Sequence, residues 1–185
     1  MARIRTTREA WIEQGLRALA AGGPDAVRVE ALAKDLGVTK GGFYGSFADR
    51  DALLGAMLDT WEREATDEVL ARVEREGGDA RTRLTRAGVL TFSSDRLLPL
   101  DLAVREWARR DAAVAERLRR VDERRMGLLR GLLGTLCADP DEVEARSLLA
   151  FCLAIGEHLL ATGHGDRTRA QVLARAADLL FAPSS

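Results

Sequence analysis

The sequence predicts an all-α protein of about nine helices, in which a small N-terminal domain precedes a larger helical domain. Apolar residues recur at helical spacing along most of the chain, and no segment shows the strict alternation expected of a half-buried strand. Hydrophobic residues make up 46% and charged residues 31% of the 185 positions, with only four prolines, which is typical of an ordered helical protein. Capping residues and glycines mark where the individual helices begin and end.

The first helix is predicted to begin at Thr6, because Thr6 and Glu9 have the spacing of a capping box. Apolar residues follow at helical spacing, and the Gly-Gly-Pro run at 22–24 ends the helix. The next two helices are predicted to form a helix-turn-helix. Gly37 stands where a left-handed cap would end the second helix, and Thr39 can cap the third. A glycine-containing connection this short is typical of such a motif.

Four helices are expected to follow the helix-turn-helix. Asp49 can cap a fourth helix whose apolar face continues as far as Val73. The fifth is expected over residues 79–93, the sixth over 99–110 with a proline at its start, and the seventh over 111–136.

The eighth and ninth helices have the clearest starts. Asp139 and Pro140 provide a cap and a first residue for the eighth, and Thr168 with Gln171 forms a capping box for the ninth. The middle of the eighth helix has no polar face, so it must be buried on all sides, either in the core of a monomer or against a second copy in a four-helix dimer interface. The residues predicted at that interface are Leu148, Leu149, Cys152, Ile155, Leu159, Val172, Leu173, Ala176 and Leu180.

The third helix carries an unusual set of glycines. Phe43 and Phe47 lie about 40° apart on a helical wheel and define an apolar face. The opposite face holds Gly41, Gly42, Gly45 and Tyr44. Three glycines cost about 3 kcal/mol relative to alanine within a helix. A face without side chains lets the backbone approach a large surface closely, and we infer that contact with such a surface offsets this cost.

Double-stranded DNA is the surface that best fits the neighbouring side chains. A helix after a tight turn can enter the major groove with its N-terminal end, where free N–H groups favour phosphate. Lys40 can neutralise one phosphate, and the Tyr44 hydroxyl can donate to another. The alternative is close packing on a neighbouring helix, but this would not leave Lys40 and Tyr44 beside the bare face. Glycines have no side chain that could hydrogen-bond to a base edge. We therefore expect the DNA sequence to be recognised through the side chains of Thr39, Lys40, Tyr44 and Ser46, through backbone donors and through DNA shape.

Several short motifs occur together between Thr6 and Trp61, in roughly a third of the chain. They are Leu32-Ala33, Gly37-Val38-Thr39-Lys40-Gly41, Phe43-Tyr44, Phe47, Arg50 and Leu53-Leu54. In residue type, turn length and position, this segment resembles the N-terminal domain of the tetracycline-repressor (TetR) family of bacterial transcriptional regulators.

The resemblance implies DNA contacts at specific positions. Lys40 and Tyr44 would contact phosphates, Thr39 would cap the recognition helix, and Arg28 would touch the DNA backbone. The full predicted set is Arg28, Thr39, Lys40, Gly41, Gly42, Tyr44, Gly45, Ser46 and Arg50. The sequence departs from the family pattern at two positions. Ser46 stands where a histidine is usual. Arg28 stands at the start of the second helix where Ser or Thr is usual, so Asp25 is another candidate cap for that helix.

The resemblance also implies a domain division and a function. Residues 1–48 would be the DNA-binding domain, and residues 49–185 the helical ligand-binding and dimerisation domain. The expected protein is a cytoplasmic repressor that binds a palindromic operator as a homodimer and is released by a small hydrophobic or amphipathic effector. The candidate pocket walls, each of which also suits an ordinary core position, are Trp61, Phe92, Trp107, Met126 and Phe151.

Other function classes have less support. Catalytic motifs, glycine-rich phosphate loops and metal-ligand spacings are missing from the sequence, so we expect no enzyme activity, cofactor or metal. The remaining alternative is a helical ligand-binding or interaction module without DNA binding. Cys137 and Cys152 are expected to be reduced core thiols, and no apolar run is long enough to cross a membrane.

Charge gives only mild support for an anionic partner near the N-terminus. Residues 1–50 hold eight basic and six acidic residues, whereas the other 135 residues hold 20 basic and 23 acidic residues. Arg3, Arg5 and Arg8 precede the first acid and either form an arm towards DNA or a solvated terminus.

Overall fold

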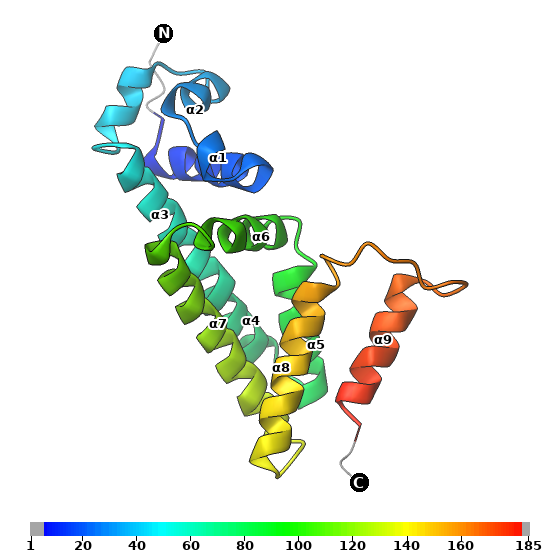
Figure 1. Cartoon of the computed structure of the whole chain (residues 1–185). Helices are drawn as coiled ribbons and strands as arrows, with labels where there is room; N and C mark the ends of the chain where they lie inside the picture. Colours follow the sequence, from blue (N-terminus) through cyan, green and yellow to red (C-terminus); the bar gives the residue numbers. More distant parts are fainter. Residues whose placement is uncertain (1–5, 183–185) are drawn as a thin grey trace. The chain divides into compact units, whose positions relative to one another are not determined.

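The computed structural model describes residues 6–182, which form nine α-helices and no strand (Figure 1). In chain order these are α1 (Arg8–Gly22), α2 (Val29–Asp35), α3 (Arg50–Arg63), α4 (Val69–Glu76), α5 (Ala80–Phe92), α6 (Leu97–Ala108), α7 (Ala112–Leu133), α8 (Pro140–Gly156) and α9 (Arg169–Leu180). Two short 3-10 helices, η1 (Pro24–Ala26) and η2 (Lys40–Gly45), and a π-helical segment, η3 (Glu64–Glu68), complete the described elements. The predicted all-α class is confirmed, while Arg3 and Arg5 lie outside the described residues.

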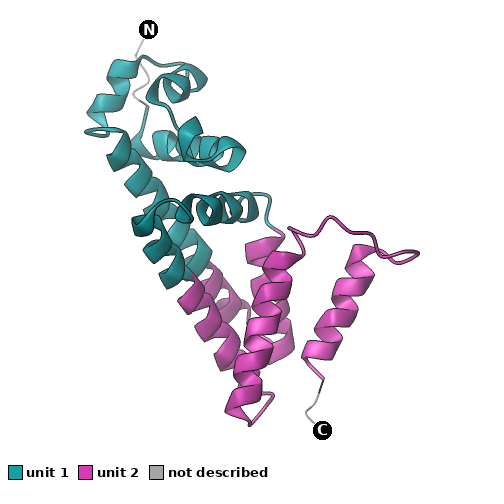
Figure 2. Cartoon of the chain, in the orientation of Figure 1, with its two compact units in different colours: residues 1–68, 94–121 teal, residues 69–93, 122–185 magenta. Residues whose placement is uncertain are grey.

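The chain divides into two compact units (Figure 2). The first comprises residues 1–68 and 94–121, and the second comprises residues 69–93 and 122–185. Helix α6 and the first part of α7 therefore belong to the same compact unit as the helix-turn-helix. The predicted functional boundary after residue 48 is a separate division and stays a prediction.

Helix α1 lies at the centre of the first unit, where it contacts α2, α3 and α6. It buries Trp11, Leu16 and Leu19, each no more than 1% exposed. A Cβ atom at Gly15 would lie 2.5 Å from the Sδ atom of Met57 on α3. Glycine at this position therefore lets α1 and α3 pack closely.

Most helix starts agree with the predicted caps. Asp49 and Asp139 accept hydrogen bonds from the first-turn N–H groups of α3 and α8 as predicted, and Thr168 forms the predicted capping box of α9. Asp79, which was predicted as the first residue of its helix, caps α5 in the same way. The first cap was wrong by one residue, because Thr7 instead of Thr6 accepts from the N–H of Ala10, at 3.2 Å.

Other helix boundaries also differ from the prediction, and α7 ends at Leu133, three residues before the predicted end. The fourth predicted helix extends to Glu76, beyond Val73, but residues 64–68 within it are π-helical. Helix α6 begins at Leu97, two residues before Pro99, and the Ser94 hydroxyl accepts from the N–H of Leu97 at 3.1 Å. A proline is tolerated there because the first-turn N–H groups of a helix have no intrahelical partner.

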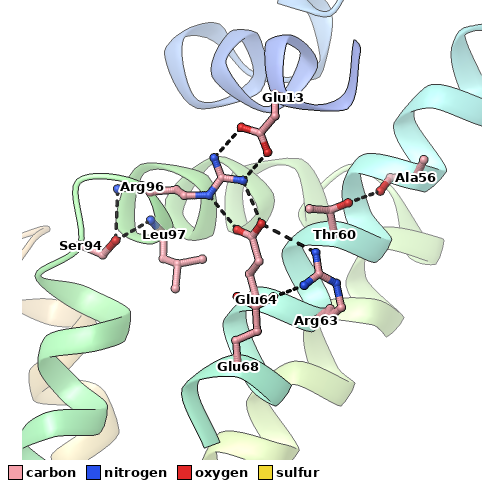
Figure 3. Close-up of polar contacts among 9 residues, drawn as sticks. All are labelled: Glu13, Ala56, Thr60, Arg63, Glu64, Glu68, Ser94, Arg96 and Leu97. Atoms are coloured by element: carbon pink, nitrogen blue, oxygen red, sulfur yellow. Dashed lines mark hydrogen bonds and ion pairs between the residues drawn. The ribbon is translucent and has the colours of Figure 1, made fainter. Parts of the chain in front are cut away.

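Arg96 joins three helical elements of the first unit (Figure 3). Its guanidinium donates to both carboxylate oxygens of Glu13 in α1, at 2.7 and 2.8 Å, and to both of Glu64 in η3, at 2.8 and 2.9 Å. The hydrogen bond from Arg96 lowers the pKa of the Glu13 carboxyl, and the bonds to Glu64 and Glu13 raise the pKa of Arg96. A single guanidinium therefore ties α1 to η3 at the start of α6.

The second unit has a small core of Leu84, Leu132 and Leu133, against which Val143 and Phe181 also pack. The expectation that the eighth helix is buried on all sides is wrong for the single chain. Helix α8 buries only one residue, Ser147, and α9 buries none.

Leucines on α8 are exposed, at 54% for Leu148 and 57% for Leu149, and Leu159 in the following turn is 68% exposed. The monomer-core interpretation of this surface is therefore not supported. Cys137 is buried as predicted, but Cys152 is exposed because it lies on the uncovered face of α8. Within residues 6–182, no helix is both long and apolar enough to cross a bilayer.

Candidate nucleic-acid interface

The turn between α2 and η2 is tight and depends on Gly37. Gly37 has a φ of 67°, in the left-handed region that glycine adopts without strain. The N–H of Val38 donates to the carbonyl of Ala33 at 2.9 Å, and the N–H of Gly37 donates to that of Lys34 at 3.1 Å. These bonds satisfy the last carbonyls of α2 and confirm the predicted glycine cap.

The segment after the turn is a 3-10 helix, whereas an α-helix capped by Thr39 was predicted. The N–H of Gly42 donates to the carbonyl of Thr39 at 2.9 Å, and the Thr39 side chain makes no capping hydrogen bond. Three glycines within six residues weaken the α-helix, and short helical segments readily adopt 3-10 geometry. Thr39 is exposed and Ser46 is half-buried at the two ends of this segment.

Two phenylalanines anchor η2 to the core of the first unit. Phe43 is fully buried and Phe47 is 4% exposed. The Phe43 ring meets the edge of Trp11 at a centroid distance of 5.3 Å and stacks on Phe47 at 5.5 Å. The Arg8 guanidinium lies over the Phe47 ring, 4.6 Å from its centroid. The predicted apolar face of the recognition segment is therefore confirmed.

The glycine face of η2 is uncovered. A Cβ atom at Gly42 or Gly45 would meet no described atom within 4 Å, and one at Gly41 would meet only the Thr39 hydroxyl, at 3.8 Å. The Tyr44 side chain is 57% exposed beside them. Within residues 6–182, close packing on another helix is therefore excluded as the reason for the glycines.

Lys40 also lies on this exposed surface, where it is paired with Glu30 of α2. Its Nζ donates to Oε1 of Glu30, and the two side chains are 50% and 67% exposed. The hydrogen bond from Lys40 lowers the pKa of the Glu30 carboxyl, and Glu30 raises the pKa of the Lys40 ammonium. Glu30 could not be predicted from the sequence as the partner of Lys40, because ten residues and a turn separate the two.

Two predicted arginines have different environments. Arg28 is exposed at the N-cap of α2 and makes no side-chain capping bond, and the other candidate cap, Asp25, lies in η1. Arg50 donates its Nε to the carbonyl of Val27 at 2.7 Å and its Nη2 to that of Pro24. Arg50 thus ties the start of α3 to the chain before α2, and its contact with DNA stays a prediction.

The predicted ligand residues are divided between the two units. Trp61 and Trp107 are buried in the first unit. In the second unit, Phe92 meets Phe151 edge to face at a centroid distance of 6.3 Å, and Met126 is half-buried. Their role in ligand binding stays a prediction.

A separate hollow of about 400 Å³ lies in the first unit between the end of α1 and α6. Its lining includes Ala20, Pro24, Leu98 and Leu102, and none of the predicted ligand residues. Residues 6–182 contain no group of three or more His, Cys, Asp or Glu side chains arranged to hold a metal ion.

The first unit therefore presents an anchored, short helical segment after a tight turn, with a cation, a phenol and bare backbone on its outer side. This is the arrangement of a helix-turn-helix DNA-binding domain.

Comparison with known proteins supports this class. Residues 5–57 match the family model of bacterial regulatory proteins of the tetR family. A TetR-family transcriptional regulator from Rhodococcus sp. is 27% identical, with 95% of this chain and 98% of that chain covered and a TM-score of 0.63. No curated protein matches this chain in sequence.

Two more distant structures share the fold over nearly the whole chain. A transcriptional regulator from Saccharomonospora viridis, in complex with choline, is 18% identical, covers 95% of each chain and has a TM-score of 0.77. AibR, in complex with isovaleryl coenzyme A and operator DNA, is 16% identical, covers 96% of this chain and 99% of that chain, and has a TM-score of 0.69. Residues 5–57 therefore match the N-terminal domain of tetR-family regulators, and the chain shares the fold of a TetR-family transcriptional regulator over nearly its whole length.

Proposed function

We propose that the protein is a ligand-responsive repressor that binds a palindromic DNA operator as a homodimer and is released by a small molecule. The observation that carries this proposal is the exposed side of η2. Phe43 in η2 and Phe47 just after it are buried, while Lys40, Tyr44 and three glycines face outward.

The geometry supports separate roles for these residues, some at the phosphates and others at the bases. Lys40 and Tyr44 contact phosphates, as does Arg28 at the start of α2. Thr39, Ser46 and the backbone N–H groups at the start of η2 approach the bases, because the glycine face admits the duplex closely. DNA shape supplies the remaining specificity.

The exposed face of α8 and of the turn after it supports homodimerisation. Leu148, Leu149 and Leu159 are each more than half exposed in the single chain, and burial in a symmetric interface removes this apolar surface from water. The other predicted interface residues are Cys152, Ile155, Val172, Leu173, Ala176 and Leu180. Two copies related by a twofold axis present two recognition segments to a palindromic site.

The effector is proposed to be a small hydrophobic or amphipathic molecule. One structure with this fold is in complex with isovaleryl coenzyme A, which is amphipathic, and another is in complex with choline, a small organic cation. The candidate pocket-wall residues are Trp61 and Trp107 within the first unit, and Phe92, Met126 and Phe151 within the second. The ligand releases DNA only if it binds one arrangement of the dimer better than the other. Since the proposed operator is chromosomal DNA, we also propose that the protein acts in the cytoplasm.

Selection of bound DNA from a random pool tests the proposed function. The full chain is expected to enrich a palindromic site, and mobility shifts at stated salt concentrations should show a dimer on that site. Enrichment of no sequence, with no shift of any duplex at low salt, would instead favour the interaction module without DNA binding.

A further inference from the structure

Lys40 already has a partner within the free protein. Its ammonium group donates to the carboxylate of Glu30, in the first turn of α2. Both side chains are at least half exposed, so burial fixes neither of them and DNA can reach both. A carboxylate is also the side-chain group that most resembles a phosphate in charge and in its acceptor oxygens.

We propose that Glu30 is a built-in competitor of DNA, whose carboxylate occupies in the free protein the place on Lys40 that a phosphate takes in the complex. This inference rests on the proposed function, because it requires that Lys40 contacts DNA.

The physical basis is an exchange of partners. A free lysine that neutralises a phosphate releases a counterion, and this release supplies most of the affinity for DNA of any sequence. A lysine that leaves a carboxylate behind gains less, because the carboxylate must recruit a cation of its own. Glu30 also remains near the approaching phosphate, and like charges repel. The Glu30–Lys40 pair thus lowers the affinity for every duplex and weakens its dependence on salt.

The competing explanation is that the pair holds η2 against α2. The structure argues against this, because η2 is anchored independently by Phe43, which packs on Trp11 and Phe47. An exposed ion pair contributes little to folding in comparison with such an anchor. The two explanations predict opposite effects of removing the carboxylate on DNA binding.

Glu30→Gln in the full chain tests the inference, by fluorescence titration of a random-sequence duplex and of the selected operator over a series of salt concentrations. We expect the variant to bind both duplexes roughly two- to fivefold more tightly at ~0.1 M salt. The slope of log K against log salt should become steeper, by at most about one. The melting temperature should stay unchanged.

Two controls isolate the effect. Glu116→Gln makes the same change of net charge on α7, outside the helix-turn-helix, and should leave affinity and salt slope close to those of the wild type. In a Lys40→Ala background, Glu30→Gln should give little further gain, because the lysine that it releases is missing.

The outcomes separate this inference from the proposed function. If the wild type binds DNA and Lys40→Ala weakens it, but Glu30→Gln binds equally or less tightly, Glu30 is not a competitor and the proposed function stands. If the wild type binds no duplex, or Lys40→Ala binds as the wild type does, the inference fails together with the role of Lys40 on which it rests.

Discussion

Phe43 and Tyr44 are adjacent in the chain, yet Phe43 is fully buried and Tyr44 is 57% exposed. Neighbouring residues of a 3-10 helix point about 120° apart, so a short segment can bind the protein core on one side and DNA on the other. The glycines at 41, 42 and 45 extend the outer side without adding side chains. At this scale, function depends on which side of η2 each residue occupies.

The phosphate role of Lys40 gives a first prediction. Lys40→Ala should weaken binding to operator and random duplexes by the same factor, because a phosphate contact carries no sequence information. It should flatten the salt slope by less than about one, because Glu30 already offsets part of the counterion release at Lys40. Titrations at several salt concentrations measure both effects. Lys34→Ala, on the last turn of α2, is a matched control that should change neither. A loss confined to one operator position would contradict a phosphate contact.

The bare face gives a second prediction, in which stability and binding change in opposite directions. Gly42→Ala adds a methyl group in open space, and should raise the free energy of unfolding by roughly 0.5–1 kcal/mol. It should weaken DNA binding roughly tenfold, since an extra methyl at a closely packed surface costs about 1–3 kcal/mol.

Urea unfolding and DNA titration test this pair of effects. Gly127→Ala is the control, because Gly127 also lies in open space but on α7. It should gain stability and bind DNA normally. Equal affinity of Gly42→Ala and the wild type would show that the duplex does not approach this face.

Among the helical elements, α1, α6 and η3 are held together by the hydrogen bonds of Arg96 (Figure 3). The Glu64 side chain is only 14% exposed, so it depends on this partner more than Glu13, which is 37% exposed. Arg63 pairs with Glu68 across the π-helical segment and extends the network. The network fixes where α6 begins relative to α1.

Arg96→Gln should therefore destabilise the protein at pH 7, by about 1 kcal/mol for a partly exposed network. The hydrogen bond from Arg96 depresses the pKa of Glu13 below 4.5, so its contribution is present above that pH and is lost as the pH falls through the lower folded value. The difference in stability between wild type and variant should shrink below about pH 4.5.

Urea unfolding at a series of pH values measures this difference. Arg109→Gln, also at the surface near the end of α6 and 79% exposed, is the control and should show almost no difference at any pH. A difference between wild type and Arg96→Gln that stays constant down to pH 3 would rule out the Glu13 contribution.

Elements that are set by interactions between neighbouring residues could be predicted from the sequence, whereas elements that are set by contacts between distant residues could not. The caps at Asp49 and Asp139 could be predicted, because a cap depends on a few neighbouring residues. The π-helical segment and the 3-10 form of η2 could not, because tertiary contacts and weak propensities decide between helix types.

The same reasoning applies to the candidate site. Burial of Phe43 and exposure of the glycines follow from helical periodicity alone. The pairing of Lys40 with Glu30, and of Arg50 with the carbonyls before α2, joins separate elements. Such contacts leave no periodic signal in the chain, and only the folded structure reveals them.

For the whole molecule, the exposed apolar surface of α8 and of the turn after it decides the proposed assembly. Leu149→Glu should give a monomer, because a charge at a buried symmetric interface meets its own copy without a partner. Operator affinity should fall by roughly a hundredfold, since one recognition segment then binds without the second. Sedimentation velocity and DNA titration measure these effects.

The control for this prediction is Val89→Glu. Val89 is similarly exposed, at 53%, but lies on α5. This variant should remain dimeric and bind the operator normally. A Leu149→Glu variant that sediments as the wild type does would remove α8 from the interface.

The most direct test of the account is to follow backbone amide signals by NMR while the selected operator is added to the full chain. The account predicts large shifts at Gly41, Gly42 and Gly45, while the side-chain signals of Phe43 and Phe47 keep the positions of a buried core. Unchanged glycine amides, together with shifts on another surface, would show that DNA binds elsewhere and would contradict the central claim.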